Sequence, residues 1–213
     1  MNKQPHPVSI FAEGLSKRFN SEWIFRNFSY EFKSGNIYAV TGPNGSGKST
    51  LLSVLWGQVP QTAGTLDYQL DRTSIAADEI FRHVAIAAPY MELIEDLTLM
   101  ECLQFHFKLK KVRNNLTYQE ILDKLYLTGN RDKFIRNFSS GMKQRVKLGL
   151  AMFTDAPVVF LDEPGSHLDQ AAFQWYRSQL ASLPTDTIIF IGSNDQAEYE
   201  NANEIIDLRA YKK

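Results

Sequence analysis

Nine residues from Gly42 to Thr50 have the types and spacing of a loop that binds phosphate groups. They read Gly42-Pro43-Asn44-Gly45-Ser46-Gly47-Lys48-Ser49-Thr50 and fit the pattern G-x-x-x-x-G-K-[ST]. Glycines let successive backbone N–H groups curl around a phosphate, and the start of a helix adds partial positive charge. Lys48 would reach the β- and γ-phosphates of a nucleotide, and the Ser49 hydroxyl would hold Mg²⁺. All nine residues are therefore predicted to bind nucleotide.

The stretches on either side of this loop have the local structure that the motif requires. Ile37–Val40 is a short apolar run of strand type, and Leu51–Trp56 has helical character. A strand, a glycine-rich turn and a helix, in this order, form the context in which the pattern binds phosphate. The alternative is a glycine-rich turn that contains Lys-Ser without this function, and the two flanks together argue against it.

Two adjacent carboxylates follow a second apolar run. Asp162 and Glu163 come directly after Val158–Leu161, which is typical of a parallel strand covered on both faces. Ligands of such sheets lie beyond the carboxyl ends of the strands, where the phosphate loop also opens. Because neighbouring strand residues point in opposite directions, we expect Asp162 to hold Mg²⁺ and Glu163 to orient the attacking water. The alternative for an isolated Asp-Glu pair is a solvated strand end.

Apolar and alternating patterns predict the elements that would position these groups. Before residue 90 they predict a strand and turn at Val8–Arg18, a strand at Phe28–Phe32, turns at Lys33–Gly35 and Thr62–Thr65, and strands at Leu66–Leu70 and His83–Ala88. After residue 153 they predict strands at Val158–Leu161, Thr187–Ile191 and Ile205–Leu208, with a helix that Asp169 caps and that runs to Leu183.

The middle of the chain has a helical pattern. Thr98–Glu101 and Thr117–Glu120 are capping boxes, and Gly129-Asn130 is expected to end the second helix. Ser139 or Ser140 would cap a third helix. We therefore expect one α/β domain over residues 1–213, in which 1–89 and 154–213 form the catalytic core and 90–153 form an inserted helical subdomain.

Composition limits the classes of protein that fit. Apolar residues make up 44% of the 213 residues, charged residues 22%, and the formal net charge is −1, so no nucleic-acid partner is expected. The single cysteine, Cys102, excludes an internal disulfide. The polar start, Met1–Pro7, has no signal-peptide pattern, and no apolar run approaches 18 residues. If this chain works at a membrane, another polypeptide is expected to span it.

The order of the motifs resembles the ATP-binding subunits of ABC transporters over essentially the whole chain. Phe138–Arg145 is similar to the family's signature segment, which usually reads Leu-Ser-Gly-Gly-Gln before a basic stretch. Ser166–Asp169 is similar to the D-loop, and Phe19 lies where the family has an aromatic residue that stacks on adenine. The resemblance implies a P-loop NTPase with a RecA-like, mainly parallel sheet, N-terminal antiparallel strands and an inserted helical subdomain. It also implies ATP and Mg²⁺ as ligands.

The signature would form a second anion site from Ser139, Ser140, Gly141 and the start of the following helix. A second phosphate site on one chain suggests a facing partner. Two chains, as a homodimer or a heterodimer with a similar ATPase, would enclose two ATP molecules in a two-fold arrangement. Binding would close the dimer and hydrolysis would reopen it. We expect integral membrane subunits as further partners, with the chain at the cytoplasmic, inner face of the membrane.

Four residues, in three motifs, depart from the family pattern. Ser140 and Met142 replace the usual Gly and Gln of the signature. Pro89 replaces a Gln that contacts Mg²⁺ and water, and Glu92 or Glu95 is left as an alternative ligand. Asn194 replaces a His that touches the γ-phosphate, which predicts slow hydrolysis because Asn carries no positive charge. The histidines His6, His83, His106 and His167 lack metal-ligand spacing and are expected to be structural or on the surface.

Three functions fit a chain that carries this phosphate loop. The first is an ATPase subunit that energises transport, of the small type found in exporters. The second is a soluble ABC-type ATPase that acts on nucleic acid or ribosomes; the chain lacks the basic extensions and tandem ATPase domains of such proteins. The third is a nucleotide kinase that shares only the phosphate loop, and the signature and Asp162-Glu163 argue against it. The transport function fits best.

Overall fold

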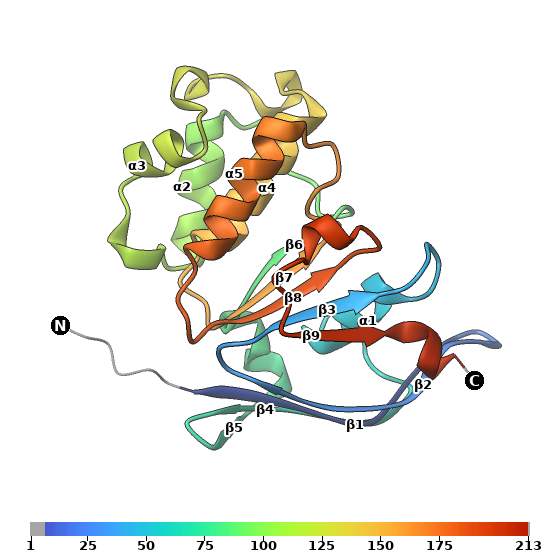
Figure 1. Cartoon of the computed structure of the whole chain (residues 1–213). Coiled ribbons are helices and arrows are strands. Elements are labelled where there is room, and N and C mark those ends of the chain that lie inside the picture. Colours follow the sequence, from blue (N-terminus) through green and yellow to red (C-terminus); the bar gives the residue numbers. More distant parts are fainter. Residues whose placement is uncertain (1–6, 213) are drawn as a thin grey trace.

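The computed structural model describes residues 7–212 of the chain. The expectations for the start of the chain and for His6 concern Met1–His6, which lie outside these residues. Two sheets and a layer of helices make up the described part (Figure 1). Besides the elements below, short 3₁₀ helices span Ala77–Arg82, Arg113–Asn115, Thr128–Asn130, Ile135–Asn137, Gln196–Glu198 and Leu208–Tyr211.

The central sheet has five parallel strands in the order β6-β7-β8-β3-β9. Its strands are β3 (Ile37–Thr41), β6 (Val84–Ala87), β7 (Val158–Asp162), β8 (Ile188–Gly192) and β9 (Glu204–Asp207). Every residue of β7 and β8 is buried, because helices or the second sheet cover both faces. This confirms the predicted parallel core.

The second sheet is antiparallel, in the order β2-β1-β4-β5. Its strands are β1 (Val8–Phe19), β2 (Glu22–Lys33), β4 (Ala63–Leu70) and β5 (Thr73–Ile75). The turn predicted at Thr62–Thr65 is wrong, because β4 already begins at Ala63. Gly64 has φ +87, and a Cβ on it would lie 2.5 Å from the carbonyl oxygen of Glu13. This glycine therefore permits close strand contact with β1 rather than a turn.

Helices cover the central sheet on both sides (Figure 1). Helix α1 (Lys48–Leu55) lies between the two sheets, and its apolar residues pack in one core with β1, β2 and β4. Helices α2 (Leu99–Leu109), α3 (Tyr118–Lys124), α4 (Ser140–Met152) and α5 (Gln170–Ala181) form the layer on the opposite side. Both predicted capping boxes are present, with Thr98 pairing with Glu101 and Thr117 with Glu120.

Two predicted helix ends are wrong. Helix α3 ends at Lys124, well before Gly129-Asn130, because Tyr126 takes a left-handed conformation (φ 56°) just beyond the C-cap. Helix α5 ends at Ala181 rather than Leu183, since Pro184 disfavours helical geometry in the residue before it. Neither change moves a predicted site residue.

Successive side chains of the central strands point to opposite faces of the sheet and so pack into two separate hydrophobic cores. Val158 and Phe160 of β7 pack toward α1 and the antiparallel sheet, whereas Val159 and Leu161 pack toward α4 and α5. The fold class predicted from the sequence is therefore confirmed. No helix among residues 7–212 is long and apolar enough to cross a bilayer.

Candidate functional site: a nucleotide site and a second anion site

The phosphate loop joins the carboxyl end of β3 to the first turn of α1 (Figure 1). Gly47 is the N-cap of α1 and has φ +103. A Cβ at this position would lie 2.4 Å from Cγ2 of Ile24, so a larger residue would collide as well as being strained. The loop thus leaves the N–H groups at the start of α1 free to bind an anion.

The Lys48 side chain is buried within this loop. Its Nζ donates hydrogen bonds to the carbonyl oxygens of Gly42 (2.9 Å) and Pro43 (3.4 Å). Ser46 is also buried, and its Oγ has no hydrogen-bond partner among the described residues. A buried hydroxyl without a partner is costly, so a ligand with acceptor oxygens would satisfy it. These groups fit a polyphosphate.

Asp162 is the last residue of β7 and is almost completely buried. Neither of its carboxylate oxygens has a hydrogen-bond partner among residues 7–212. Burial raises the pKa of Asp162 to about 6, and the charge of Glu163 adds to this, while Ser49 and Lys48 oppose it. An unsatisfied buried carboxylate near a serine hydroxyl fits a cation such as Mg²⁺, which prefers oxygen ligands.

Glu163 leaves the strand in a left-handed conformation, with φ 48°. Its N–H donates to the carbonyl oxygen of Gly192 (2.8 Å), and its Oε2 lies 3.5 Å from the Ser166 hydroxyl. The expectation that strand alternation separates the two carboxylates is therefore wrong. The turn after β7 separates them, and it leaves Asp162 buried and Glu163 half-buried.

The central sheet brings the predicted nucleotide-binding and catalytic groups to one edge. Asp162 pairs with Gly192 of β8, and Gly192 pairs with Val40 of β3, two residues before the phosphate loop begins at Gly42. Asn194 follows β8 at the same edge and its side chain is exposed. Lys48 and Ser49 start α1 just after β3, Asp162 ends β7 with Glu163 in the turn that follows, and Asn194 follows β8, so the ends of three strands supply the candidate site.

The signature segment lies at the start of α4, in the helical layer above the sheet (Figure 1). Ser139 is the N-cap, and its Oγ accepts a hydrogen bond from the N–H of Met142 (3.2 Å). Ser139 and Ser140 are exposed, and a Cβ on Gly141 would lie 2.9 Å from the carbonyl oxygen of His167. A larger residue than glycine would therefore push the signature away from the D-loop.

Two residues that sequence reasoning missed hold the loop after β7. Gln144, buried on α4, donates from Nε2 to the carbonyl oxygen of Pro164 (3.0 Å). Glu198, also buried, accepts a hydrogen bond from the N–H of Gly165 (3.1 Å). Asp169 follows this loop as the N-cap of α5, and its Oδ1 accepts from the N–H of Ala172 (2.8 Å). The position of Gln144 beside the signature was the only sequence signal for its role.

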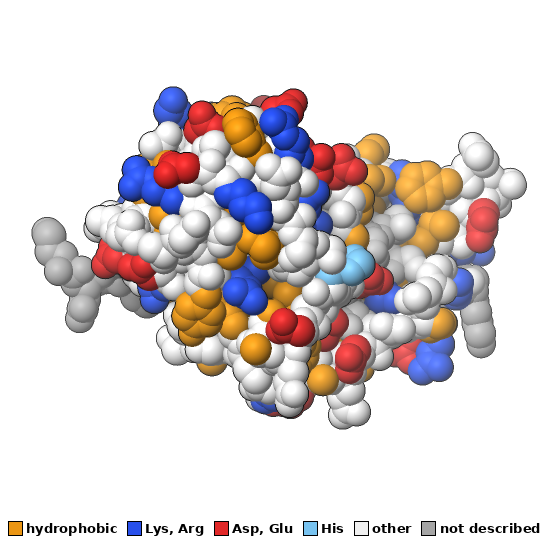
Figure 2. Space-filling view, turned by 90° about the horizontal axis from the view of Figure 1, so that it is seen from above, with side chains coloured by type: hydrophobic (Ala, Val, Ile, Leu, Met, Phe, Trp, Pro, Cys, Tyr) orange, Lys and Arg blue, Asp and Glu red, His pale blue; other side chains and the backbone are white. Residues whose placement is uncertain are grey.

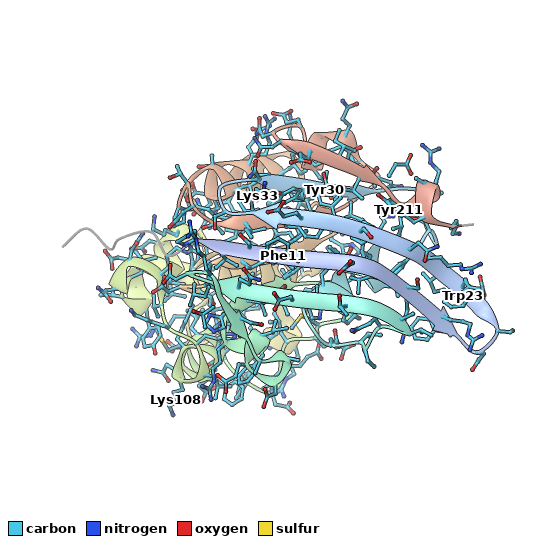
Figure 3. The ribbon with its side chains drawn as sticks, turned by 90° about the horizontal axis from the view of Figure 1, so that it is seen from below. Phe11, Trp23, Tyr30, Lys33, Lys108 and Tyr211 are labelled. Atoms are coloured by element: carbon cyan, nitrogen blue, oxygen red, sulfur yellow. The ribbon has the colours of Figure 1, made fainter. Side chains whose placement is uncertain are left out.

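The aromatic residues of the β1–β2 hairpin lie at its far end. Phe19 ends β1, is 47% exposed, and has the Lys17 ammonium 4.7 Å from its ring centre. Trp23 lies at the tip of the same ribbon, with the guanidinium groups of Arg18 and Arg26 5.2 and 4.9 Å from its ring (Figure 3). Trp23 is a second candidate for stacking on the adenine ring, and the sequence prediction did not include it. The pattern that points to it is an aromatic residue between two arginines, Arg18 and Arg26.

A separate cavity of about 390 Å³ lies at the opposite edge of the central sheet. Its lining includes Pro157 and Thr187, which directly precede β7 and β8, together with the buried Arg113. It therefore does not belong to the candidate nucleotide site at the carboxyl ends of the strands.

The family model described as ABC transporter matches residues 25–166, more than half of the chain. The chain belongs to the ABC transporter family. A probable sulfate/thiosulfate import ATP-binding protein of Chlorella vulgaris is 31% identical over 93% of this ABC transporter chain and 86% of its own length. A sulfate/thiosulfate import ATP-binding protein of Thermosynechococcus vestitus is 31% identical over 93% of the chain, and an uncharacterised ABC transporter ATP-binding protein of Bacillus subtilis is 30% identical over 92%.

This chain spans 61% and 65% of the lengths of the last two relatives. Solved structures share its fold. An ATP-binding protein of a putative ABC transporter from Pyrococcus furiosus has a TM-score of 0.80 at 19% identity, with 96% of this chain and all of that chain covered. A bacterial Atm1-family ABC exporter with ATP bound has a TM-score of 0.79 at 17% identity, with 95% of this chain and 38% of that chain covered.

Proposed function

We propose that this chain binds and hydrolyses ATP to energise transport by separate membrane-spanning subunits. The observation that carries the proposal is the meeting of the phosphate loop, Asp162 and Glu163 at one edge of the central sheet. Two of these elements contain buried polar atoms with no hydrogen-bond partner within residues 7–212, the Ser46 hydroxyl and the Asp162 carboxylate. A triphosphate with its cation would supply those partners.

Each group has a distinct task in this proposal. Lys48 and the N–H groups at the start of α1 bind the β- and γ-phosphates. Glu163 orients the attacking water and accepts its proton, while the Asn194 amide donates a hydrogen bond to the γ-phosphate. Phe19 stacks on the adenine ring, with Trp23 as a second candidate in the same hairpin.

The Mg²⁺ ion would be held by the Ser49 hydroxyl and by Asp162, directly or through water. When bound, it would neutralise charge on the β- and γ-phosphates. The unpartnered oxygens of Asp162 support this assignment. Glu92 and Glu95 have less support as cation ligands, because both are exposed and Glu95 pairs with Lys143.

A second chain would complete each site. Ser139, Ser140 and Gly141 lie at an exposed helix start and would face the γ-phosphate bound by a partner's loop, in a homodimer or in a heterodimer with a similar ATPase. The D-loop, from Ser166 to Asp169, borders Gly141 through His167 and would lie at the same interface. ATP would then join the two chains, and hydrolysis would part them.

Membrane subunits would anchor this ATPase at the inner face of the cell membrane. The segment between β6 and α2 exposes the apolar side chains of Met91 (41%) and Ile94 (48%), which gives such a subunit an apolar contact. Seen from the helical side, positive and negative side chains are interspersed, which favours a protein partner over nucleic acid (Figure 2). Export stays a prediction; a transport assay in vesicles of both orientations tests it.

The substitution Glu163→Gln tests the proposal. It keeps the size of the side chain but removes its ability to accept a proton, so ATP binding should persist while turnover falls at least about a hundredfold. The variant should also form a dimer in Mg-ATP, measured by size-exclusion chromatography with light scattering. Glu200→Gln, a change of an exposed glutamate paired with Arg177 on the surface, is the matched control. A Glu163→Gln variant that hydrolyses ATP at the parent rate would contradict the assignment.

A further inference from the structure

The segment Pro89–Asp96, here called the bridging segment, connects β6 to the N-cap of α2. It begins with Pro89, whose side chain has no hydrogen-bonding group. Besides contacts of Glu95 and Asp96 with Arg136, which precedes the signature, its contacts run in two directions, to α1 in the core and to α4 in the helical layer. These are the two helices whose first turns carry the phosphate loop and the signature.

On the α1 side the contact is made by Tyr90. Its hydroxyl lies 3.0 Å from Oγ of Ser53 and 3.3 Å from Oε1 of Gln58. Ser53 is buried and donates its own hydroxyl hydrogen to the carbonyl oxygen of Ser49 (2.7 Å). The single hydroxyl hydrogen of Ser53 is used in that bond, so a hydrogen bond with Tyr90 uses the phenol hydrogen, which Tyr90 shares between Ser53 and Gln58. A continuous chain of hydrogen bonds therefore runs from the bridging segment to the backbone of Ser49.

On the α4 side two lysines hold the bridging segment. Lys143 forms an ion pair with Glu95, and Lys147 donates from Nζ to the carbonyl oxygen of Pro89 (3.4 Å). Lys143 lies one turn after Ser139, and its N–H donates to the carbonyl oxygen of Ser139 (2.9 Å). Ser53 thus lies one helical turn from Ser49, and Lys143 and Lys147 lie one and two turns from Ser139, so both sides reach a serine assigned to the nucleotide or its cation.

The Tyr90 contact is the stronger of the two links. The Glu95 side chain is 58% exposed, and solvent-exposed ion pairs contribute little to stability. Burial and the nearby charge of Asp162 raise the pKa of Tyr90, against the bond to Ser53, so the phenol stays protonated and able to donate. The Tyr90 ring also lies against Trp56, at the end of α1, with a centroid separation of 6.4 Å.

We propose that Tyr90 is a positioning residue that ties the bridging segment to the phosphate-loop helix. Its hydrogen bond to Ser53 would take the place of a side-chain contact that Pro89 cannot make. A displacement of the bridging segment would then be transmitted to the backbone of Ser49. This inference rests on the proposed ATPase function. Tyr90 acts through Ser53 and Ser49, without touching the nucleotide, so its loss lowers the rate of hydrolysis more than the affinity for ATP.

The contact itself is tested on nucleotide-free protein by a double-mutant cycle. Tyr90→Phe and Ser53→Ala should each raise the equilibrium constant of unfolding in urea about fivefold. Ser53→Ala also removes the bond to the Ser49 carbonyl, so the double variant should raise the constant by clearly less than the product of the two single factors, because both changes break the shared Tyr90–Ser53 bond. Tyr126→Phe, at a tyrosine that is 71% exposed, is the matched control and should change the constant little.

The role in hydrolysis is tested by steady-state kinetics of the full chain. Tyr90→Phe should lower kcat about fivefold and leave KM for ATP within about twofold of the parent. Thr117→Ala removes the cap of α3, so it should lower stability to a similar degree without lowering kcat.

Three results would count against the inference. An additive cycle, or a Tyr90→Phe variant with the parent kcat, overturns the positioning role while the ATPase function stands. A parent chain that neither binds nor hydrolyses ATP refutes the proposed function and, with it, the role of Tyr90.

Discussion

Nε2 of Gln144 lies 3.0 Å from the carbonyl oxygen of Pro164, and this hydrogen bond joins the signature helix to the loop that carries Glu163. The same amide lies 3.4 Å from the carbonyl oxygen of Glu163 itself. Gln144 is buried, so these carbonyl groups have little access to water. The position of the proposed catalytic carboxylate therefore depends on a side chain of α4, in the helical layer.

Replacing Gln144 should affect stability and turnover together. Gln144→Leu leaves the Pro164 carbonyl buried without its donor, so the free energy of unfolding should fall by about 1–3 kcal/mol. The rate of ATP hydrolysis should fall as well, because Glu163 loses support. Urea unfolding and a phosphate-release assay measure the two effects. Gln174→Leu, on the exposed face of α5, is the control, and equal results for the two variants would contradict the role of Gln144.

Removing the Lys48 side chain should weaken ATP binding. A charged donor to phosphate contributes about 1.5–3 kcal/mol, so Lys48→Ala should raise the Kd for ATP roughly tenfold to a hundredfold. Isothermal titration calorimetry measures this change. Lys108→Ala removes an exposed lysine of α2, remote from the phosphate loop, and should leave the Kd unchanged (Figure 3). An unaltered Kd for Lys48→Ala would discredit the phosphate loop.

The raised pKa of Asp162 predicts how the stability of the nucleotide-free protein depends on pH. The carboxyl titrates at about 6 in the folded chain and near 4 in the unfolded chain. Between these values the folded chain binds more protons, so the contribution of Asp162 lowers the free energy of unfolding as pH rises. Asp162→Asn should remove this decrease with pH and raise the free energy of unfolding at pH 7 by up to about 3 kcal/mol.

A second test of Asp162 asks whether its carboxylate helps to bind Mg²⁺. Mg²⁺ needs the ionised carboxylate, so the affinity for Mg-ATP should fall as pH drops below about 6 in the parent chain and should be weak at all pH values in Asp162→Asn. Urea unfolding and nucleotide titrations from pH 5 to 8 measure both effects. A variant that is less stable than the parent at pH 7 and binds Mg-ATP normally would contradict the assignment.

Replacing Asn194 by histidine should raise turnover. A charged imidazolium forms a stronger hydrogen bond to phosphate than an amide does, and we expect about a tenfold gain in kcat at pH 6 that declines above the imidazole pKa. Asn194→Ala should lower kcat instead, since it removes the donor. Steady-state rates from pH 6 to 8 distinguish the variants. No gain in Asn194→His would mean that the site is adapted to asparagine.

Sequence by itself determined the family, the fold class and the residues that begin several of the key helices. The phosphate loop, the two capping boxes, Asp169 as an N-cap and the apolar strands β7 and β8 follow local rules of backbone geometry and periodicity, which a single stretch of chain expresses completely. Some helix and strand ends did not follow from local patterns, because Tyr126 and Gly64 adopt conformations that depend on neighbouring elements.

Only the tertiary structure decided which of these elements contact one another and through which side chains. The links of Gln144 to Pro164, Glu198 to Gly165 and Tyr90 to Ser53 join residues 20 to 37 positions apart. Such contacts depend on how helices pack over the sheet, and no local pattern encodes a partner at that separation. The unpartnered oxygens of Asp162 likewise arise from burial by several elements, and this burial makes an ordinary aspartate a candidate for binding a cation.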